Sequence, residues 1–475
     1  MLAMSMIFFP ILLAGVMYVM TRNQPSAAKY IALVWFGIEL VVALVLLGQL
    51  PESGFLELGQ FLNVPQMHFA LDLRVDALSV AMLILTAGLL ILVTLSAWEE
   101  KNPAGFFALL VLFSGPIFGV FMTTNVLWFF MFWELTLAPM YFLVGVWGGE
   151  RRIYAAIKFF LYTHVASMFM FVGFYLLYKQ TGVWDLTLIK EAALATPALI
   201  WWLMFIGFAA KLPAFPFHTW LPDAHVEAPA SISVLLAGVL LKMGAYGLIR
   251  FTVELMPVTT KEYAIWMAVI GINTTLFAGM LAIYERHIKR MVAYSSISHM
   301  GLVLVAIGTM TYDGLSAALY EMIGHALVIS PLFLLAGWMH HKTHTWYMDE
   351  MGGIMTKAPF AAAIFVLAGM AALGLPGTMG FIGEMTIIVS AIKSYGWWIA
   401  LIAIASLLSA GYIIWAVRRA LHGEPSEIVA HATFEMSRAE QLALALFAIM
   451  IVYFGIQPQG IFDLANQAFA FMGGK

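Results

Sequence analysis

Apolar runs of roughly 20 residues recur along this chain from end to end, and they restrict its fold more than any other feature. Of its 475 residues, 63% are hydrophobic and only 10% are charged. A soluble chain carries about 25% charged residues, because its surface faces water. Backbone N–H and C=O groups find no water partners in hydrocarbon, which favours helices for runs of this length. The sequence therefore predicts an all-α integral membrane protein.

Hydropathy and polar punctuation predict about fourteen membrane helices, with no long polar linker between them. The expected helices span 3–20, 28–50, 77–98, 105–122, 124–147, 153–178, 196–218, 229–252, 263–283, 290–310, 314–339, 358–391, 398–419 and 440–457. The longest charged loop, from Arg418 to Glu440, is too short for a folded module. We therefore expect residues 1–475 to form a single membrane domain.

Two of the predicted helices contain residues that should interrupt them. The segment 196–218 contains Pro213 and Pro216, and the segment 358–391 contains Pro376 among several glycines. Proline removes a backbone donor and clashes with the preceding turn, so each helix should break there. Paired broken segments in two halves of a chain are typical of inverted-repeat transporters, with the ion path at the breaks. The alternative is two incidental kinks.

The distribution of lysine and arginine predicts the orientation in the membrane. These residues are about twice as frequent in loops after odd-numbered helices as in the other loops, and basic loops favour the cytoplasmic side. We therefore expect both termini on the outer face of the inner, cytoplasmic membrane of a prokaryote.

Seven ionisable residues fall within the predicted apolar helices. They are Glu39, Glu134, Lys211, Lys242, Glu321, His325 and Glu384. Each would cost about 2.5–3.5 kcal/mol at the bilayer centre, and together on the order of 15 kcal/mol, which exceeds a typical folding free energy. They must therefore pair or face water inside the bundle. The number and spread of these groups favour a proton relay over buried ion pairs that only fix helix packing.

Two of these residues have no partner of opposite charge close by on their own helix. Glu134 has no cation within one turn, so we expect it to pair with Lys211 at the break of the seventh helix. Lys242 likewise has no local carboxylate. An ion pair at about 4 Å and an effective dielectric near 20 is worth roughly 4 kcal/mol. Moving a proton against about 180 mV costs a similar amount, so forming and breaking one pair is on the right scale to gate a pumped proton.

Several histidines could extend such a relay. Glu321 and His325 are four residues apart and share a helix face. Histidine titrates near neutral pH, which favours a relay over a metal half-site that lacks further ligands. His299, on the tenth helix, is a possible accessory site. His218 and His225, after the seventh helix, could pass protons into the bundle, although helix capping or plain loop structure explains them equally well.

Several classes of chemistry are excluded or disfavoured. The chain has no cysteine, which excludes disulfides and thiolate-ligated iron–sulfur clusters. It has no phosphate loop, dinucleotide fingerprint or nucleophile triad. The cluster of His340, His341 and His344 is more typical of an interfacial loop than of a metal site. We therefore expect no metal, no cofactor and no nucleic-acid partner for this chain.

Four stretches together resemble the antiporter-like proton-pumping subunits of respiratory complex I, NADH:quinone oxidoreductase. The longest runs from Lys211 to Gly247, and the others are Phe132–Leu143, Asp72–Ser79 and Ala293–Leu302. The likeness covers nearly the whole chain. It is closest to the chain M type, called subunit 4 in mitochondria: chain L types carry a long lateral helix at the C-terminus, and chain N types tend to have lysine at the position of Glu384.

The resemblance implies two inverted five-helix repeats, at approximately 105–252 and 263–419. It also implies a Glu134–Lys211 pair, a central Lys242, His325 beyond it and Glu384 as the terminal site, joined by water. Redox energy would come from partner subunits that hold quinone, flavin and iron–sulfur clusters. The chain would then work with other membrane-arm subunits and not as an isolated monomer. The alternative within the same resemblance is a subunit of a multisubunit cation/proton antiporter.

Three residues depart from this pattern or stand outside it. Position 321 is usually a neutral amide in the family, so Glu321 adds a charge beside His325. Position 164 is usually uncharged, so His164 has no role to carry over. Glu39 stands alone on the second helix, and we expect it to lie against a neighbouring subunit. The electron donor, NADH, ferredoxin or F420, and the choice between proton and sodium stay open.

Overall fold

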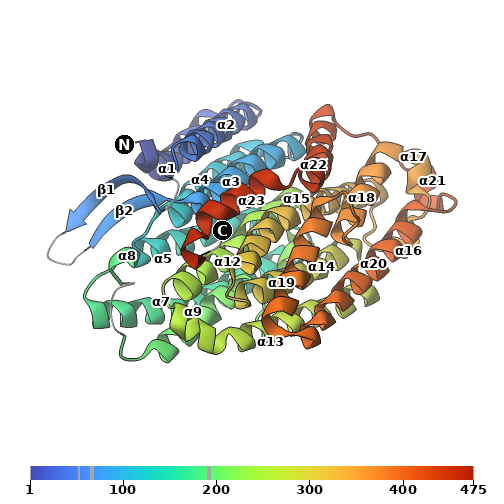
Figure 1. Ribbon diagram of the computed structural model, residues 1–475. Coiled ribbons are helices and arrows are strands. Elements are labelled where there is room, and N and C mark those ends of the chain that lie inside the picture. The colour runs from blue at the N-terminus through green and yellow to red at the C-terminus, as the bar shows by residue number, and fades with distance from the viewer. Residues whose placement is uncertain (1, 52–53, 65–68, 190–193, 474–475) are drawn as a thin grey trace. The chain divides into compact units, whose positions relative to one another are not determined.

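The computed structural model describes residues 2–51, 54–64, 69–189 and 194–473, which are mostly helical (Figure 1). Residues 1 and 474–475, the ends of the predicted domain, lie outside this part. Within the described residues, twelve helices are long and apolar enough to cross a membrane. Two shorter apolar helices, Pro197–Lys211 and Pro359–Ala372, belong to the segments predicted to be broken. The predicted class, an all-α membrane protein, is confirmed.

The chain divides into two compact units. The first comprises Met1–Lys211, Met243–Tyr263 and Leu464–Lys475, and the second Leu212–Lys242 and Ala264–Asp463. The inverted repeats expected at 105–252 and 263–419 stay a prediction.

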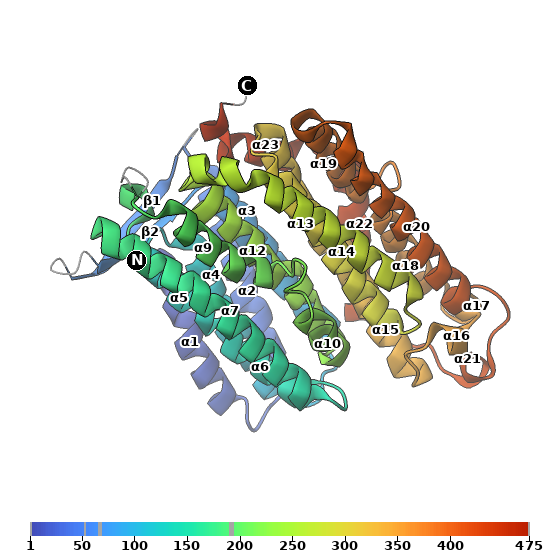
Figure 2. The ribbon, with the colours of Figure 1, turned by 90° about the horizontal axis from the view of Figure 1, so that it is seen from below.

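Antiparallel packing of apolar helices forms the first unit. Its helices are α1 (Leu2–Met20), α2 (Ala27–Gly48), α3 (Ala77–Ser96), α4 (Pro103–Met122), α5 (Val126–Leu135), α6 (Leu137–Trp147), α7 (Arg152–Thr181), α8 (Leu186–Ile189), α9 (Pro197–Lys211) and the π-helical η3 (Leu248–Glu254). Helix α7 packs against α6 and α9, and α1 packs against α4 (Figure 2).

The second unit is built around one long buried helix, α15 (Tyr312–Thr343). The other helical segments of this unit are α10 (Trp220–Glu227), α11 (Ala230–Leu235), the π-helical η2 (Leu236–Leu240), α14 (Ile288–Gly308), α16 (Met348–Met351), α17 (Ile354–Lys357), α18 (Pro359–Ala372), α19 (Met379–Tyr395), η4 (Trp397–Ala403), α20 (Ile404–Ala416), η5 (Val417–Leu421), α21 (Glu427–His431) and α22 (Arg438–Ile456). Helices α11, α14, α18, α19 and α22 contact α15 directly. Helices α12 (Leu241–Gly247), α13 (Pro257–Tyr284) and α23 (Gln459–Ala468) contain residues of both units, and η6 (Ala470–Met472) follows.

Both predicted helix breaks are confirmed. Helix α9 ends at Lys211, before Pro213, and no regular helix follows until α10. Helix α18 ends at Ala372, and α19 begins six residues after Leu373. In this gap Gly374 and Gly377 have φ values of +80° and +89°, a conformation that favours glycine. The breaks place Lys211 at a helix end and Glu384 in the second turn of α19.

The structure contains a β-hairpin and a helix near the C-terminus that were not predicted. Strand β1 (Leu56–Val64) pairs antiparallel with β2 (Phe69–Val75), with Leu56 opposite Val75, in a segment for which no helix was predicted. Leu71, Leu73 and Val75 are fully buried and alternate with polar residues, a period-two pattern that a search restricted to long apolar runs overlooks. Helix α23 was also missed, because it is short and amphipathic.

A buried charge network joins two segments of the first unit. Arg250, on η3, pairs with Asp76 and, at 2.8 Å, with Glu254. Asp76 also caps α3, because its side chain accepts from the backbone N–H of Ser79 at 2.9 Å. Arg250 additionally donates to the Ser79 hydroxyl at 3.1 Å. The network ties the start of α3 to η3, which ends the membrane span Ala230–Glu254.

Arg250→Ala should destabilise the protein by about 3–5 kcal/mol, because it leaves Asp76 charged and buried without its partner. Thermal unfolding of the purified protein in detergent measures this as a lower midpoint. The matched control is Arg286→Ala, since the Arg286 side chain is 72% exposed. Equal midpoints for the two variants would contradict a structural role for the network.

His287 begins α14 and lies outside the membrane-spanning helices. Its Nδ1 accepts from the backbone N–H of Arg290 at 3.3 Å, and its ring stacks on Trp346 with 5.1 Å between ring centres. Burial, and then the charges of Arg290 and Lys289, lower the pKa of His287 from 6.5 to about 3. The neutral imidazole is therefore the form that the fold requires.

His287→Asn should remove part of the acid sensitivity of the fold. Because the folded-state pKa is depressed, the stabilisation is fully present above pH 6.5 and is lost as the pH falls toward 3. At about pH 5 the loss amounts to about 2 kcal/mol. Asparagine keeps the helix cap without titrating. Unfolding midpoints at neutral and acidic pH test this, with the exposed His341→Asn as control, and an unchanged pH dependence in His287→Asn would contradict it.

Candidate functional site

A group of ionisable side chains meets inside the second unit. These residues, which we call the Lys242 cluster, are Lys242 on α12, His299 on α14, Glu321 and His325 on α15, Glu384 on α19 and Ser406 on α20. All except the half-buried Ser406 are buried, with at most 5% of the residue exposed. Five helices from different parts of the sequence thus contribute side chains to one polar site.

Lys242 forms the first link of the cluster. Its Nζ lies 2.6 Å from Nδ1 of His325 and donates to the carbonyl of Ala237 at 2.7 Å. A lysine ammonium only donates, so Nδ1 of His325 accepts when Lys242 is charged. The carbonyl of Ala237 belongs to η2, a widened π-helical turn that the sequence did not predict. Such turns are frequent at functional sites in membrane and soluble helices.

His299 faces two carboxylates. Its Nδ1 lies 3.0 Å from Glu321 Oε1 and 3.8 Å from Glu384 Oε1, and Ser406 donates to Glu384 Oε2 at 2.7 Å. The rings of His299 and His325 have centres 5.6 Å apart. Glu321 and His299, predicted as possible accessory residues, are therefore integral members of the cluster.

The position of the Glu321 carboxylate depends on a glycine of α19. A Cβ atom at Gly383 would collide with the carboxylate of Glu321. Glycine at this position therefore leaves room for the Glu321 carboxylate beside the helix that carries Glu384. In chemical terms the cluster holds one amine, two imidazoles and two carboxylates, a set that can bind a variable number of protons.

A second group lies in the first unit. Glu134, on α5, contacts His164 on α7, with 2.6 Å between Oε2 and Nδ1. Ser167, one turn further along α7, donates to the other carboxylate oxygen. Helix α5 begins at Asn125, whose side chain accepts from the backbone N–H of Leu127 and Trp128, which fixes the turns that carry Glu134. We call Glu134, His164, Ser167 and Lys211 the Glu134 cluster.

The structure shows no hydrogen bond between Glu134 and Lys211, so the expected pairing of these two residues stays a prediction. Lys211 Nζ has no hydrogen-bond partner among the described residues, although Glu134 lies near enough to act on it electrostatically. The ammonium instead lies 5.5 Å from the ring centre of Trp133 and 5.6 Å from that of Phe159. The carboxylate turns toward α7, because His164 and Ser167 offer a donor to each of its oxygens.

Sequence reasoning missed His164 because the family pattern assigns it no role. The sequence does contain an indication of this polar group, since His164 and Ser167 are three residues apart on one face of a predicted membrane helix. An ionisable residue within such a helix is a functional candidate by default.

Two of the predicted histidines, His218 and His225, remain to be placed. His218 is buried in the turn between α9 and α10, and its ring stacks on Phe215 at 5.7 Å. His225 is fully buried, stacks on Phe333 at 4.5 Å, and neither ring nitrogen has a hydrogen-bond partner among the described residues. Neither histidine is hydrogen-bonded to the Lys242 cluster within the part of the chain that the structure describes.

Two further expectations are wrong. Glu39 is fully buried and accepts from Trp35 Nε1 at 2.7 Å, so it is not exposed to a neighbouring subunit. His340 and His341 belong to the last turn of α15 instead of a loop. His340 stacks on Trp346 with ring centres 3.7 Å apart. No group of three metal-ligating side chains occurs within residues 2–473 where the structure describes them.

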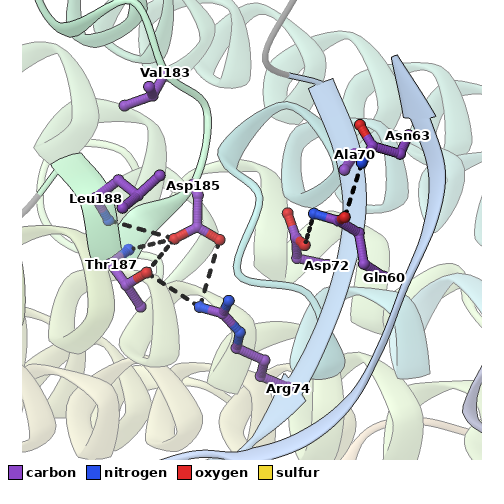
Figure 3. Close-up of a pocket in the computed structure, with 9 residues that line it drawn as sticks. All are labelled: Gln60, Asn63, Ala70, Asp72, Arg74, Val183, Asp185, Thr187 and Leu188. Atoms are coloured by element: carbon purple, nitrogen blue, oxygen red, sulfur yellow. Dashed lines mark hydrogen bonds and ion pairs between the residues drawn. The ribbon is translucent and has the colours of Figure 1, made fainter. Parts of the chain in front are cut away.

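A surface pocket of about 380 Å³ opens on the first unit between the hairpin and α8 (Figure 3). Arg74 lies 3.5 Å from Asp185 and donates to Thr187, and Gln60 donates to Asp72 at 2.8 Å. These polar lining residues thus form hydrogen bonds and an ion pair with one another. None of the predicted relay residues lines it.

Comparison with known proteins shows the family to which the chain belongs. Residues 123–409 match the family described as NADH:quinone oxidoreductase/Mrp antiporter, transmembrane. NADH-quinone oxidoreductase subunit M of Rickettsia conorii is 33% identical, over 96% of each chain. A chain of respiratory complex I from Thermus thermophilus with bound NADH superposes with a TM-score of 0.88 at 25% identity, over 100% of each chain. A chain of the Mrp complex of a Dietzia species has a TM-score of 0.91 at 19% identity, over 99% of this chain and 97% of that one, which shows the shared fold.

The family match covers more than half of the sequence, and the similarity to subunit M extends over nearly all of it. The chain therefore belongs to the transmembrane family of NADH:quinone oxidoreductases and Mrp antiporters, and within it resembles subunit M.

Proposed function

We propose that this chain translocates protons as a membrane-arm subunit of an NADH:quinone oxidoreductase-type complex. The observation that carries the proposal is the Lys242 cluster, in which titratable groups from four helices lie buried close to one another. The names of the relatives supply the context, since subunit M is a part of NADH-quinone oxidoreductase.

The cluster supports a stepwise transfer. Lys242 Nζ gives a proton to Nδ1 of His325 along their 2.6 Å contact, and His325 then releases the proton on its Nε2. That nitrogen, Nε2 of His299 and Oε2 of Glu321 are buried and lack hydrogen-bond partners among the described residues. Buried polar groups normally have a partner, so water between the two imidazoles would complete the path. His299 Nδ1 next hands a proton to Glu384, while Glu321 balances the positive charge.

The Glu134 cluster would set the timing of this transfer. A carboxylate near Lys211 stabilises the charged ammonium, and a carboxylate held elsewhere does not. The proposal assigns Glu134 and Lys211 to control and Lys242, His325 and Glu384 to transport.

The proposal extends to the surroundings of the chain. The Glu134 and His164 side chains are 19% and 40% exposed on a face with exposed apolar residues such as Leu161 and Val165. An ionisable pair that faced lipid would be costly, which supports a neighbouring subunit on this face. Redox cofactors would reside in partner subunits, and both termini would lie on the outer face of a prokaryotic inner membrane.

A second candidate function is cation/proton antiport. The TM-score of 0.91 against a chain of the Mrp complex favours it, although the low sequence identity limits that likeness to the fold. Sodium-dependent proton movement in vesicles that contain the purified complex and no quinone would support antiport. Proton movement that requires NADH and quinone would support the first proposal.

Lys242→Ala should abolish most proton translocation. It leaves His325 Nδ1 without its partner, a loss of about 1.5–3 kcal/mol for a charged hydrogen bond, or about tenfold to a hundredfold in rate. The initial rate of quinone-dependent proton uptake by proteoliposomes with the purified complex measures the effect. Lys261→Ala, at an exposed position, is the control. Wild-type pumping by an assembled Lys242→Ala complex would leave only a packing role for the cluster.

A further inference from the structure

We propose that His164 is a second partner of Glu134 that competes with Lys211, so that the carboxylate alternates between two positions. In this structure Glu134 occupies the position at His164. The inference rests on the proposed function, because it assigns to one residue of the chain the control of proton transfer. No role for position 164 follows from the family pattern, where the residue is usually uncharged.

The first argument is the way in which α7 holds the carboxylate. Oε2 of Glu134 lies 2.6 Å from His164 Nδ1, and Oε1 accepts from the Ser167 hydroxyl. An ionised carboxylate only accepts hydrogen bonds, so Nδ1 of His164 carries the proton in this arrangement. Each carboxylate oxygen thus has a donor on the same helix.

The second argument is the state of Lys211. The residue is 1% exposed and its Nζ has no hydrogen-bond partner among the described residues, although a buried amine normally has one. The rings of Trp133 and Phe159 lie against the ammonium at cation–π distance. These cation–π contacts partly stabilise the charged ammonium while the carboxylate is away. Glu134 already acts on Lys211 electrostatically, so it is the group that can complete the missing contact.

The third argument is the difference between the two positions. The His164 side chain is 40% exposed, whereas Lys211 is buried, so one partner holds the carboxylate near the surface of the chain and the other holds it in the interior. Phe160 stacks parallel to the His164 ring, with 5.7 Å between centres and an angle of 11°, and holds the imidazole toward Glu134. His164 is therefore a positioning residue that acts through Glu134.

The test compares variants of the intact complex in proteoliposomes, with proton uptake as the readout and subunit content as the check of assembly. His164→Phe removes the competing donor, so Glu134 should remain with Lys211 and proton uptake should fall by about tenfold. His164→Asn keeps a donor at the place of Nδ1 and should recover most of the rate. Tyr175→Phe, at an exposed position of the same helix, should pump like the wild type.

A double-mutant cycle separates a role through Glu134 from general damage to the helix. If His164 acts through Glu134, the pair Glu134→Gln and His164→Phe should pump no less than Glu134→Gln alone. Losses that multiply in the double variant would overturn the proposal. Should His164→Phe not assemble, Ser167→Ala removes the other donor on α7 and should lower proton uptake in the same direction.

The outcomes distinguish this inference from the proposed function. Wild-type uptake in His164→Phe together with a defective Glu134→Gln would overturn the switch and leave the proposed function standing. Failure of His164→Asn to recover the rate lost in His164→Phe would also overturn the switch as described. Wild-type uptake in Glu134→Gln would instead overturn the role of Glu134 in the proposed function.

Discussion

An ionisable side chain inside hydrocarbon must have a partner, and the structure of this chain is organised by that requirement. The second unit meets it by bringing Lys242, His299 and Glu384 to one long buried helix that contributes Glu321 and His325. The first unit meets it with the Glu134 cluster and with the Arg250 network. The Arg250 network and the two relay clusters differ in how their charges are paired. Arg250 is held by two carboxylates at once. In the Lys242 cluster, one histidine lies close to two carboxylates that can each take up a proton.

Irregular backbone places these groups. Lys211 ends α9, Glu384 follows the gap between α18 and α19, and Lys242 bonds to a carbonyl of a π-helical turn. In each case the chain departs from regular α-helix where a charged side chain is needed. Non-helical backbone at membrane depth is tolerated only where it is buried in protein or faces a polar cavity, so the breaks and the charges support each other.

The sequence was sufficient for features that depend on transfer free energy and on backbone chemistry. Apolar runs predicted the membrane helices, and Pro213 and Pro376 predicted both breaks. Features that depend on side-chain direction were not accessible in this way. Hydropathy shows that Glu134 needs a partner, but it does not show that the carboxylate turns to His164 instead of Lys211. It likewise does not show that Glu39 faces inward onto Trp35. The hairpin was missed because its alternation is only a few residues long.

The central claim is that protons reside on the buried residues of the Lys242 cluster during turnover. Infrared difference spectroscopy of the intact complex, recorded between the resting state and steady turnover with NADH and quinone, tests it most directly. The account predicts a carboxylate-to-carboxylic-acid conversion that disappears when Glu384 is replaced by Gln. A difference spectrum in which no carboxyl signal depends on Glu384 would contradict it.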